Sequence, residues 1–384
     1  MKMVILARGG SKGVLRKNLQ KVNGISLTAR SIIAAKNSEC VSEIIVSTDS
    51  EEIASEAKKF GALVHKRSVK AASDKASTED ALDDFLQSSF MSHDDEQFFG
   101  YIQPTNPFIK SSEIDAAFGI ISNHLNISTI FSARRHHGFL WESEQGEYKI
   151  SEGINHNFRI PRSRRQDDNK LEYEEDGGFY ILNKIEYERT RNRFGSAPYA
   201  FESVVNFPIE IDSYLDLKMC QTLAPIFDHT LVASILPKLV IADFDGVFTD
   251  DKVYVDDKGR EAISANRSDG IGVKKIREKG IPLIILSSEV NKVASYRAEK
   301  MGVEIILGER DKLARAKDIS DRLKIDLCDI CFVGNDINDL PLLKRVGIPL
   351  MPLNAAPELF QYGFGIIPRK GGEGVIRCLA DLIL

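Results

Sequence analysis

The sequence predicts an α/β protein with two doubly wound domains, each built on a parallel sheet. Short apolar runs at residues 3–6 and 238–242 have the length of buried strands, and helical segments separate such runs. This alternation of strand and helix is typical of parallel sheets, whose ligand sites lie at the carboxyl ends of the strands. The length of 384 residues also exceeds one ordinary hydrophobic core. We therefore expect a first domain over residues 1–228, a linker over 229–237 and a second domain over 238–384.

Composition and charge indicate a soluble globular protein and argue against general binding to nucleic acid or membranes. The chain is 43% hydrophobic and 28% charged, which is typical of a soluble globular protein. A formal net charge of −5 gives no general attraction to nucleic acid or to an anionic membrane, so local basic loops must bind any anionic substrate. No apolar run reaches the roughly 20 residues that cross a bilayer, and residues 1–6 are too short for a signal peptide.

The five cysteines are odd in number and scattered, as expected for reduced thiols in a cytoplasmic protein. Cys328 and Cys331 form a Cys-x-x-Cys pair, but no second pair and no histidine pair accompanies them. We therefore expect no zinc site there, and we interpret the pair as the start of a buried strand.

A glycine-rich basic loop follows the first apolar run and organises the amino-terminal half. Gly9, Gly10 and Gly13 allow a tight turn that brings backbone N–H groups close to an anion. The loop also carries four cations that suit a polyphosphate, namely Arg8, Lys12, Arg16 and Lys17. Neither Gly-x-x-x-x-Gly-Lys-Ser/Thr nor Gly-x-Gly-x-x-Gly fits these residues. The loop predicts a nucleotide-phosphate site of another kind, and the alternative is a solvated basic turn.

The run Ala-Arg-Gly-Gly-Ser-Lys-Gly at residues 7–13, with Arg-Lys-Asn at 16–18, resembles the signature of the N-acylneuraminate (sialic acid) cytidylyltransferases. The resemblance implies that the loop binds the triphosphate of CTP. Lys17 would contact the leaving group as a catalytic residue, and the implied nucleotide contacts are Arg8, Gly10, Ser11, Lys12 and Asn18. The related 3-deoxy-octulosonate cytidylyltransferases lack Gly-Ser-Lys-Gly, which favours the sialate branch.

Two further matches follow in the order of this family. Arg67 and the run that contains Ser77 resemble residues near the cytosine and ribose, although Ser77 also reads as a helix cap. The turn Gln-Pro-Thr-Asn-Pro at 103–107 resembles the family's Gln-Pro-Thr-Ser-Pro, in which Gln103 offers a donor and an acceptor to a sugar or base. Asn106 is a departure from that pattern.

The acceptor sugar of the family lies between an Arg-Gln-Asp run and a Glu-Asn-Gly-x-x-Tyr run. The matching residues imply Arg165, and next Arg164, as partners of the sugar carboxylate, because a guanidinium binds a carboxylate through two hydrogen bonds. They also imply that Tyr180 or Phe179 packs against the sugar. Asp176 replaces the Asn of the family.

Three further segments complete the first domain. We expect residues 132–137 to form a loop that borders the acceptor pocket, and residues 142–157 to form an excursion that in this family helps dimer packing. Glu210 and Asp212 lie two residues apart in an extended segment, so both point to one face and can bind Mg²⁺ together with phosphates. Glu210 stands where the family usually has Asp, which makes Asp212 the safer ligand.

A second signature opens the other half of the chain. The run Asp-Phe-Asp-Gly-Val-Phe-Thr-Asp at 243–250 resembles the haloacid-dehalogenase phosphatases, and closely their branch that acts on nonulosonate and octulosonate phosphates. The resemblance implies Asp243 as the nucleophile that forms an aspartyl-phosphate, and Asp245 as the acid and then the base. Ser287 would bind a phosphoryl oxygen, and Lys312 would neutralise charge on the phosphate and nucleophile.

The final motif of that superfamily corresponds here to Gly-Asn-Asp-Ile-Asn-Asp at residues 334–339. The resemblance implies a Mg²⁺ site whose ligands are Asp243, Asp245, Asn335 and Asp336. Asn335 stands where Asp is more usual, so its amide oxygen can bind a metal but carries no charge. Asp339 is retained in its usual place.

The second domain reads as capless, because no long insertion that could form a lid separates Asp245 from Ser287. Such members close their sites through neighbouring subunits. The tail Gly-Gly-Glu-Gly-Val-Ile-Arg at 371–377 resembles one that extends towards a neighbour's site, which implies a substrate contact for Arg377. We therefore expect a homo-oligomer, with dimers of transferase domains and a tetramer through the phosphatase domains.

Together the resemblances imply two Rossmann-like domains, a nucleotidyltransferase domain and a haloacid-dehalogenase-like domain, in one bifunctional enzyme. The first would transfer CMP from CTP to N-acylneuraminate and release pyrophosphate, and the second would remove phosphate from the sialate 9-phosphate, with Mg²⁺ in both. One alternative is transfer to another nonulosonate, of the deaminated-sialate or legionaminate type, with the second domain as an oligomerisation module. Another is a nucleotide-binding regulator that releases no pyrophosphate.

Overall fold

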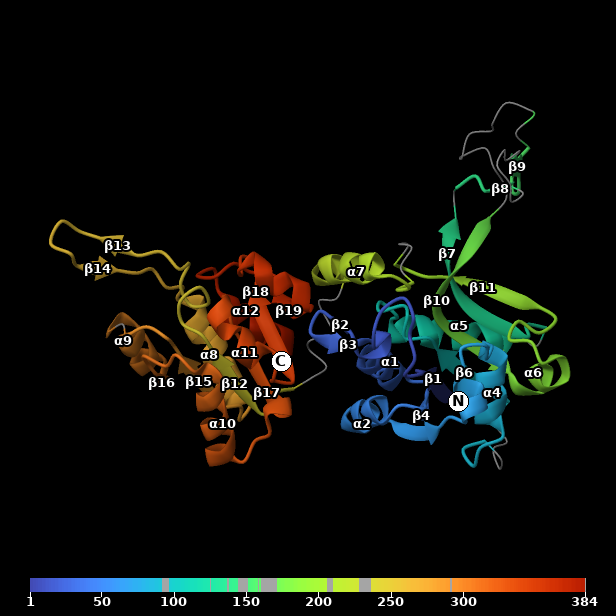
Figure 1. Ribbon diagram of the computed structural model, residues 1–384, viewed down its shortest axis with the longest axis horizontal. Helices are drawn as coiled ribbons and strands as arrows, with labels where there is room; N and C mark the ends of the chain where they lie inside the picture. Colours follow the sequence, from blue (N-terminus) through green and yellow to red (C-terminus); the bar gives the residue numbers. More distant parts are fainter. Residues whose placement is uncertain are drawn as a thin grey trace.

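The computed structural model shows two sheets, each covered by helices on both faces (Figure 1). It describes residues 1–91, 97–124, 126–136, 138–143, 151–157, 159, 171–205, 210–227, 236–290 and 292–383. The α/β architecture with two successive sheets is the one that the sequence predicts. Of the predicted linker, residues 229–235 lie outside the described ranges, so the boundary itself stays a prediction.

Seven strands form the first sheet, in the order β11-β7-β10-β6-β1-β4-β5. Their bounds are β1 (Lys2–Leu6), β4 (Glu43–Thr48), β5 (Leu63–Lys66), β6 (Phe98–Ile102), β7 (Thr129–His136), β10 (Glu172–Asn183) and β11 (Pro198–Glu202). β1, β4, β5 and β6 are parallel, as predicted. β10 runs antiparallel to both of its neighbours, which the sequence did not predict. The described chain between β7 and β10 holds two short strands and no crossover helix, and such a return favours antiparallel pairing.

Helices pack on both faces of the first sheet. Their bounds are α1 (Leu27–Lys36), α2 (Glu51–Lys59), α3 (Val69–Ala72), α4 (Thr78–Leu86), α5 (Ser111–Asn123), α6 (Lys184–Thr190) and α7 (Tyr214–Phe227), with the 3₁₀ turn η1 (Lys17–Leu19). One apolar core joins the sheet to α1, α2 and α5, and a second joins it to α4 and α6. The predicted cap at Ser77 is present, since Ser77 Oγ accepts from Asp80 N at 3.0 Å. Ser50 caps α2 in the same way, with Oγ accepting from Ile53 N at 3.5 Å.

Six parallel strands form the second sheet, in the order β16-β15-β12-β17-β18-β19. Their bounds are β12 (Leu239–Ala242), β15 (Leu283–Leu286), β16 (Glu304–Ile306), β17 (Ile330–Val333), β18 (Ile348–Pro352) and β19 (Gly365–Ile367). The strand order reverses between β12 and β17. In open α/β sheets a ligand crevice lies at the carboxyl ends of the two strands where the order reverses.

Two apolar cores flank the second sheet, one towards α8, α9 and α12 and the other towards α10 and α11. The helix bounds are α8 (Ser268–Glu278), α9 (Lys292–Met301), α10 (Lys312–Leu323), α11 (Leu340–Leu343) and α12 (Val375–Ile383), with 3₁₀ turns η4 (Leu327–Asp329), η5 (Ile337–Asp339) and η6 (Pro357–Tyr362). None of the helices in the described part of the chain is long and apolar enough to cross a membrane.

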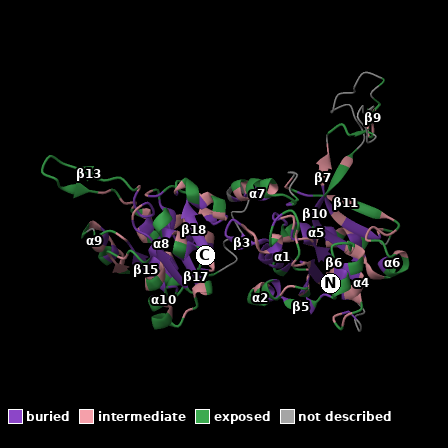
Figure 2. Ribbon diagram, viewed as in Figure 1, coloured by how far each residue is buried: buried purple, intermediate pink, exposed green. Residues whose placement is uncertain are grey.

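Three hairpins lie outside the sheets. They are β2 (Lys21–Val22) with β3 (Ile25–Ser26), β8 (Trp141–Ser143) with β9 (Ser151–Gly153), and β13 (Tyr254–Val255) with β14 (Glu261–Ala262). The β13–β14 hairpin projects from the second half and is exposed along its length (Figures 1 and 2). It is too short to have been recognised in the sequence.

One predicted loop is a strand. Ser132 to His136 belong to β7 and pair with β10 and β11, so they do not form a loop beside a pocket, and His137 lies outside the described residues. Arginine and histidine side chains in succession are typical of an exposed loop, which is why the sequence predicts one here. They lie on an extension of β7 in which Arg134 pairs with Glu174 of β10.

Candidate active sites

A cavity of about 410 Å³ opens at the carboxyl ends of β1 and β6, where the strand order of the first sheet reverses. It is lined by residues that the sequence singled out far apart along the chain. These are Arg8, Ser11, Lys12, Lys17, Asn18, Arg67, Ser77, Gln103, Glu210 and Asp212. Gly10 is exposed and does not line the cavity.

The glycine-rich loop is held in its shape by contacts with other residues of this chain. Gly13 must lack a side chain, because a Cβ there would lie 2.0 Å from the backbone oxygen of Asp212. The N–H of Gly9 donates to Asp49 Oδ1 at 2.8 Å, so a carboxylate of this chain, not a ligand, accepts that donor. Asn18 is buried and its Nδ2 donates to the backbone oxygen of Arg8 at 2.8 Å. Asn18 therefore holds the loop in place.

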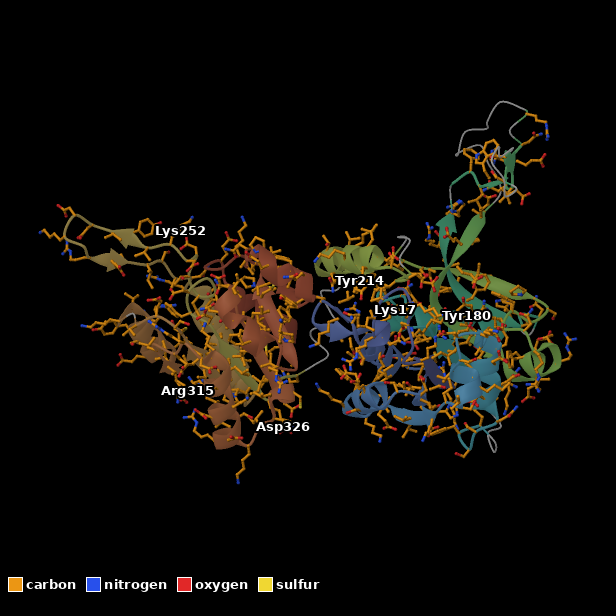
Figure 3. All side chains as sticks on the ribbon, viewed as in Figure 1. Lys17, Tyr180, Tyr214, Lys252, Arg315 and Asp326 are labelled. Carbon is orange, nitrogen blue, oxygen red and sulfur yellow. The ribbon has the colours of Figure 1, made fainter. Side chains whose placement is uncertain are left out.

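The cations of the loop have carboxylate partners in the described structure. Lys17 Nζ lies 3.0 Å from Asp212 Oδ1, and Figure 3 shows Lys17 in the first half of the molecule. Arg8 and Lys12 both pair with Asp74, at 3.2 and 2.9 Å. The hydrogen bond from Lys12, with the charges of Lys12 and Arg8, lowers the pKa of Asp74. Such partly exposed pairs contribute little stability, so a polyphosphate can displace Asp74.

Arg67 is held rigidly at the wall of the cavity. Its side chain is buried, with Nε donating to Ser47 Oγ at 3.1 Å and Nη2 donating to the backbone oxygen of Ser47 at 2.8 Å. Ser47 Oγ also lies 3.0 Å from Nδ1 of buried His65. Burial lowers the pKa of Arg67 to about 10, although the charges of Asp49 and Asp84 oppose this effect, and the guanidinium stays charged at neutral pH.

Glu210 and Asp212 face the same cavity, as expected for a pair that shares a cation. Thr105 Oγ1 donates to Glu210 Oε1 at 3.2 Å. Burial and the nearby charge of Asp212 raise the pKa of Glu210. Two carboxylates in each other's field, beside a basic phosphate loop, offer the hard oxygen ligands that Mg²⁺ prefers. Residues 207–209 of the predicted extended segment lie outside the described ranges.

The acceptor side of the cavity is only partly described. Arg164 and Arg165 lie outside the described residues, so their contacts with a sugar carboxylate stay a prediction. The predicted ring contacts of Phe179 and Tyr180 with the sugar are wrong, because the two side chains are 1% and 2% exposed and belong to the two cores of the sheet. Tyr180 stacks on Tyr101 at 4.4 Å between ring centroids.

Tyr180 keeps one polar contact. Its hydroxyl donates to Glu175 Oε2 at 2.5 Å, and Figure 3 shows Tyr180 within the body of the first half. Burial raises the pKa of Tyr180, and the hydrogen bond to Glu175 raises it further, so the hydroxyl stays protonated. The hydroxyl is thus the polar part of the Tyr180 side chain, and its ring is packed in the core.

Two departures from the family pattern contact each other. Asn106 Nδ2 donates to the backbone oxygen of Asp176 at 3.1 Å. The Asp176 carboxylate is buried and accepts from Ser132 Oγ at 2.5 Å, Ser203 Oγ at 2.6 Å and Gly178 N at 3.0 Å. Asp176 therefore joins β7, β10 and the chain after β11 beneath the acceptor side.

The second site lies where β12 and β17 end. Lys312, the first residue of α10, places Nζ 2.8 Å from Asp243 Oδ2 and 2.6 Å from Asp339 Oδ1. Burial, and next the charge of Asp339, raise the pKa of Asp243 against the opposing effect of Lys312. Burial alone would lower the pKa of Lys312, but the two carboxylates outweigh it and raise that pKa, so the ammonium stays charged.

Asp245 differs from Asp243 in its surroundings. Its Oδ1 accepts from Thr249 Oγ1 at 3.3 Å, and burial raises its pKa. A carboxyl group that keeps its proton closer to neutral pH is suited to donate that proton to a leaving group. Ser287 follows β15 and is buried, with its Oγ accepting from Glu289 N at 3.1 Å.

Asn335 and Asp336 follow β17 but are placed differently. Asn335 Oδ1 is buried and has no hydrogen-bond partner among the described residues, so it is free to bind a cation beside Asp243 and Asp245. Asp336 is exposed and its Oδ1 accepts from Ile337 N at 2.7 Å, which caps η5. The oxygen ligands of this set fit Mg²⁺.

Asp339 is not among the metal ligands that the resemblance implies, but it contacts more groups of this site than they do. It is fully buried, and its Oδ2 accepts from Asn335 N at 2.8 Å and from Asp336 N at 3.3 Å. Its other oxygen holds Lys312. Asp339 thus positions both the Lys312 ammonium and the loop that carries Asn335. The spacing within residues 334–339 was the signal that could have assigned this role.

The predicted role of Arg377 in a neighbour's site stays a prediction. Arg377 lies in α12, with Nε 2.7 Å from Asp381 Oδ2 and its N–H bonded to Asp269 Oδ1 at 3.0 Å. The glycines before α12 pack on the catalytic loop of their own chain, where Gly372 N donates to the backbone oxygen of Val247 at 3.1 Å. This part of the tail therefore belongs to the packing of its own second half.

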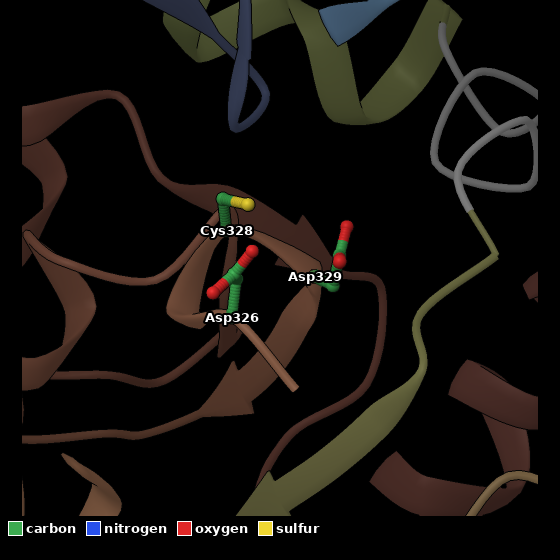
Figure 4. A group of neighbouring side chains, drawn as sticks. All are labelled: Asp326, Cys328 and Asp329. Carbon is green, nitrogen blue, oxygen red and sulfur yellow. The ribbon is translucent and has the colours of Figure 1, made fainter. Parts of the chain in front are cut away.

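One group of side chains in the described part of the chain has metal-ligand spacing outside these sites. It consists of Asp326, Cys328 and Asp329, which Figure 4 shows close together before β17. Lys238 Nζ lies 2.9 Å from Asp329 Oδ2, so an ammonium already neutralises this carboxylate. Cys331 is buried in the core while Cys328 is exposed, so the Cys-x-x-Cys thiols do not share a site.

Comparison with known proteins decides the family of the first half. Residues 3–230, more than half of the chain, match the family model described as cytidylyltransferase. The chain belongs to the cytidylyltransferase family. It is 30% identical over 385 aligned residues to N-acylneuraminate cytidylyltransferase A of Danio rerio, an alignment that covers 99% of this chain and 88% of that protein.

The second half of this cytidylyltransferase carries another enzyme segment. Residues 283–379 match the model for haloacid dehalogenase-like hydrolases. The chain is 28% identical over 161 residues to 3-deoxy-D-manno-octulosonate 8-phosphate phosphatase of Yersinia pestis, covering 42% of this chain and 86% of that protein. A crystal structure of the Yersinia pestis phosphatase aligns at 28% identity over 41% of this chain and 85% of that one, with a TM-score of 0.39. The two family matches and the two curated relatives show that the chain is an enzyme with a transferase part and a hydrolase part.

Proposed function

We propose that the first half transfers CMP from CTP to N-acylneuraminate and releases pyrophosphate. The observation that carries the proposal is the cavity in which Lys17, Arg8, Lys12 and Arg67 surround one space. Four cations in one cavity suit a nucleoside triphosphate better than a ligand with a single charge. The acceptor is proposed from the relative in Danio rerio, whose name states that substrate.

In this reaction the sugar hydroxyl oxygen attacks the α-phosphorus, the bond to pyrophosphate breaks, and the hydroxyl proton is released. Arg8, Lys12 and Lys17 neutralise the departing pyrophosphate, and Arg67 fixes the nucleotide from a buried position. Holding both substrates in this geometry supplies most of the acceleration, because a bimolecular encounter becomes a reaction within one complex. Glu210 and Asp212 would hold Mg²⁺, which when bound neutralises phosphate charge.

Steady-state kinetics on two variants test this assignment. Lys17→Met should lower kcat for pyrophosphate release by roughly a hundredfold or more, because a cation that faces the leaving group is lost. Asp212→Asn keeps the shape of the side chain and should raise the Mg²⁺ concentration needed for half-maximal rate. The exposed Lys58→Met on α2 serves as a control for a lost charge outside the cavity and should leave kcat unchanged. Equal kcat in all three variants and the wild type would contradict the proposal.

We further propose that the second half hydrolyses the phosphate monoester of the sialate 9-phosphate. Asp243 attacks phosphorus and forms an aspartyl-phosphate as the bond to the sugar oxygen breaks, while Asp245 gives its proton to the leaving alkoxide. Asp245 then takes a proton from water, whose oxygen attacks phosphorus, and inorganic phosphate leaves the regenerated Asp243 carboxylate. Lys312 stays charged between Asp243 and Asp339 and stabilises negative charge on the phosphoryl oxygens. Asp243, Asp245 and Asn335 would hold Mg²⁺, which when bound stabilises charge on the transferring phosphoryl group.

Phosphate release from the sialate 9-phosphate tests this second activity. Asp243→Asn removes the nucleophile and should lower the rate by roughly a thousandfold or more. The same variant should release pyrophosphate at the wild-type rate, which controls for folding of the whole chain. If the second half is an oligomerisation module instead, phosphate release will be absent in the wild type too.

We also propose a homo-oligomer, a cytoplasmic location and a division into domains at residues 229–237. Exposed apolar side chains on two of the hairpins support the first proposal, among them Trp141, Tyr254 and Val255. Five free cysteines support the second. Light scattering at working concentration tests the oligomer, and a monomer would contradict it.

A further inference from the structure

The β2–β3 hairpin connects the first half of the molecule to the second. Its turn consists of Asn23 and Gly24, both with positive φ (+50° and +81°), a pair that favours two-residue hairpins. The tip reaches the edge of the second sheet, where β19 has only β18 as a neighbour. Asn23 Oδ1 accepts from Ile366 N at 2.8 Å, and Gly24 N donates to the backbone oxygen of Gly363 at 2.9 Å.

At this contact the backbone of the hairpin tip packs directly against the backbone of the second sheet. A Cβ on Gly24 would lie 3.0 Å from Gly365 N and 3.2 Å from the backbone oxygen of Pro349. A Cβ on Gly365 would lie 3.2 Å from the backbone oxygen of Asn23. Glycine on both sides therefore permits the approach. The hairpin tip satisfies backbone groups on a sheet edge, and such groups are otherwise open to pairing.

Helix α7 makes the second contact between the halves. Lys218 Nζ donates to the backbone oxygen of Phe360 at 3.4 Å. Gln221 Nε2 donates to the backbone oxygen of Lys21 at 2.9 Å, which joins α7 to the hairpin. Figure 1 shows α7, β2 and β3 between the two sheets. The hairpin and α7 thus form one docking surface, made of residues 21–26 and 214–224.

Both elements of this docking surface continue directly from transferase site residues. Lys17 and Asn18 lie three to four residues before the hairpin, and Asp212 lies two residues before α7. Lys17 and Asp212 pair with each other in the cavity at 3.0 Å. A displacement of the hairpin relative to α7 would therefore change the separation of these two side chains.

We propose that the docked second half positions the phosphate loop of the transferase site, with Asn23 and Lys218 as the positioning residues. Neither residue touches the cavity, so each acts through the hairpin or α7. The proposal rests on the proposed transferase function for its kinetic readout, whereas the docking itself is measurable without any substrate.

Variants at Asn23 separate the side-chain contact from the backbone conformation. Glycine adopts positive φ without strain, so Asn23→Gly keeps the turn and removes the acceptor for Ile366 N. Asn23→Asp keeps an acceptor and serves as the matched control. Asn23→Gly combined with Lys218→Ala removes the two side-chain hydrogen bonds described above, to Ile366 N and to the backbone oxygen of Phe360. Hydrogen exchange at residues 363–367 and 17–24 reports docking in the full chain, and KM for CTP reports the loop.

In the double variant we expect faster exchange in both segments and a KM for CTP raised by roughly threefold to tenfold, the size of effect that lost hydrogen bonds give. Phosphate release should keep its wild-type rate, and Asn23→Asp should match the wild type throughout. Faster exchange with an unchanged KM would overturn the proposal. Unchanged exchange in the double variant would also overturn it, because these hydrogen bonds would then not hold the halves together. If the wild type itself releases no pyrophosphate, the proposed transferase function fails while the exchange result still decides the docking.

Discussion

Lys312 allows a quantitative test of the second site, because it is the one cation between two buried carboxylates there. The side chains of Lys312, Asp243 and Asp339 are 1%, 8% and 0% exposed. Lys312→Met keeps the length of the side chain and leaves both carboxylates without a cation. Breaking a buried ion pair in this way costs about 3–5 kcal/mol. We expect a loss of that size in the free energy of unfolding of the second half at pH 8, without Mg²⁺.

The loss should depend on pH in a defined direction. Burial and the charge of Asp339 already raise the pKa of Asp243, and Lys312 opposes them. Without Lys312 the pKa rises further, so the folded variant holds a proton that the unfolded chain releases above about pH 4. The variant therefore loses stability as pH rises, and the difference from the wild type should shrink towards pH 5.

Calorimetry of the full chain measures the effect, because two domains give separate transitions when they unfold independently. The exposed Lys317→Met on the same helix controls for loss of a lysine and should change the transition little. Lys312→Met with Asp339→Asn should recover much of the loss, since one buried charge is removed. A loss below about 1 kcal/mol at pH 8, or an equal loss at pH 5 and pH 8, would refute the reasoning.

Three further predictions concern single side chains. Ser47→Ala removes the acceptor of Arg67 Nε and should raise KM for CTP by about fivefold with kcat unchanged. Ser47→Thr keeps the hydroxyl and should keep the wild-type KM. A fall in kcat alone would contradict this role of Ser47. Asn335→Asp adds a charge to the oxygen ligands and should tighten Mg²⁺ binding by about tenfold in calorimetric titration, and unchanged affinity would place the metal elsewhere. Burial raises the pKa of Asp269 to about 6, so the folded state loses stability as pH rises from about 4 to about 6 and this side chain ionises. Asp269→Asn should therefore stabilise the protein by about 2 kcal/mol at pH 7, and the gain should disappear between about pH 6 and pH 4. A gain that persists at pH 4 would contradict the assigned cause.

The sequence located most of both sites because their residues follow strands in compact motifs. Residues 8–18 and 243–250 each directly follow an apolar run, and parallel strands bring such segments to one sheet edge. The burial of Tyr180 could also be predicted from the sequence, since residues 179–182 are apolar on both faces of β10, a pattern typical of a central strand. It was missed because the resemblance assigned the ring to the sugar.

Other features depend on distances that no local pattern encodes. The pairing of Arg8 and Lys12 with Asp74 requires the fold to bring residues more than sixty positions apart into contact. The contact of Asn23 with Ile366 spans 343 positions and joins two domains that the sequence presents as separate. The β13–β14 hairpin has strands of two residues each, too short for any periodicity to be read.

The measurement that tests the central claim most directly is the stoichiometry of products from CTP and N-acetylneuraminate with Mg²⁺. The account predicts one pyrophosphate for each CMP-sugar formed, with neither product when the sugar or the nucleotide is omitted. Pyrophosphate release without the sugar would indicate a nucleotide hydrolase instead. No pyrophosphate with N-acetylneuraminate, nor with a deaminated or legionaminate-type sugar, would contradict cytidylyl transfer by this chain.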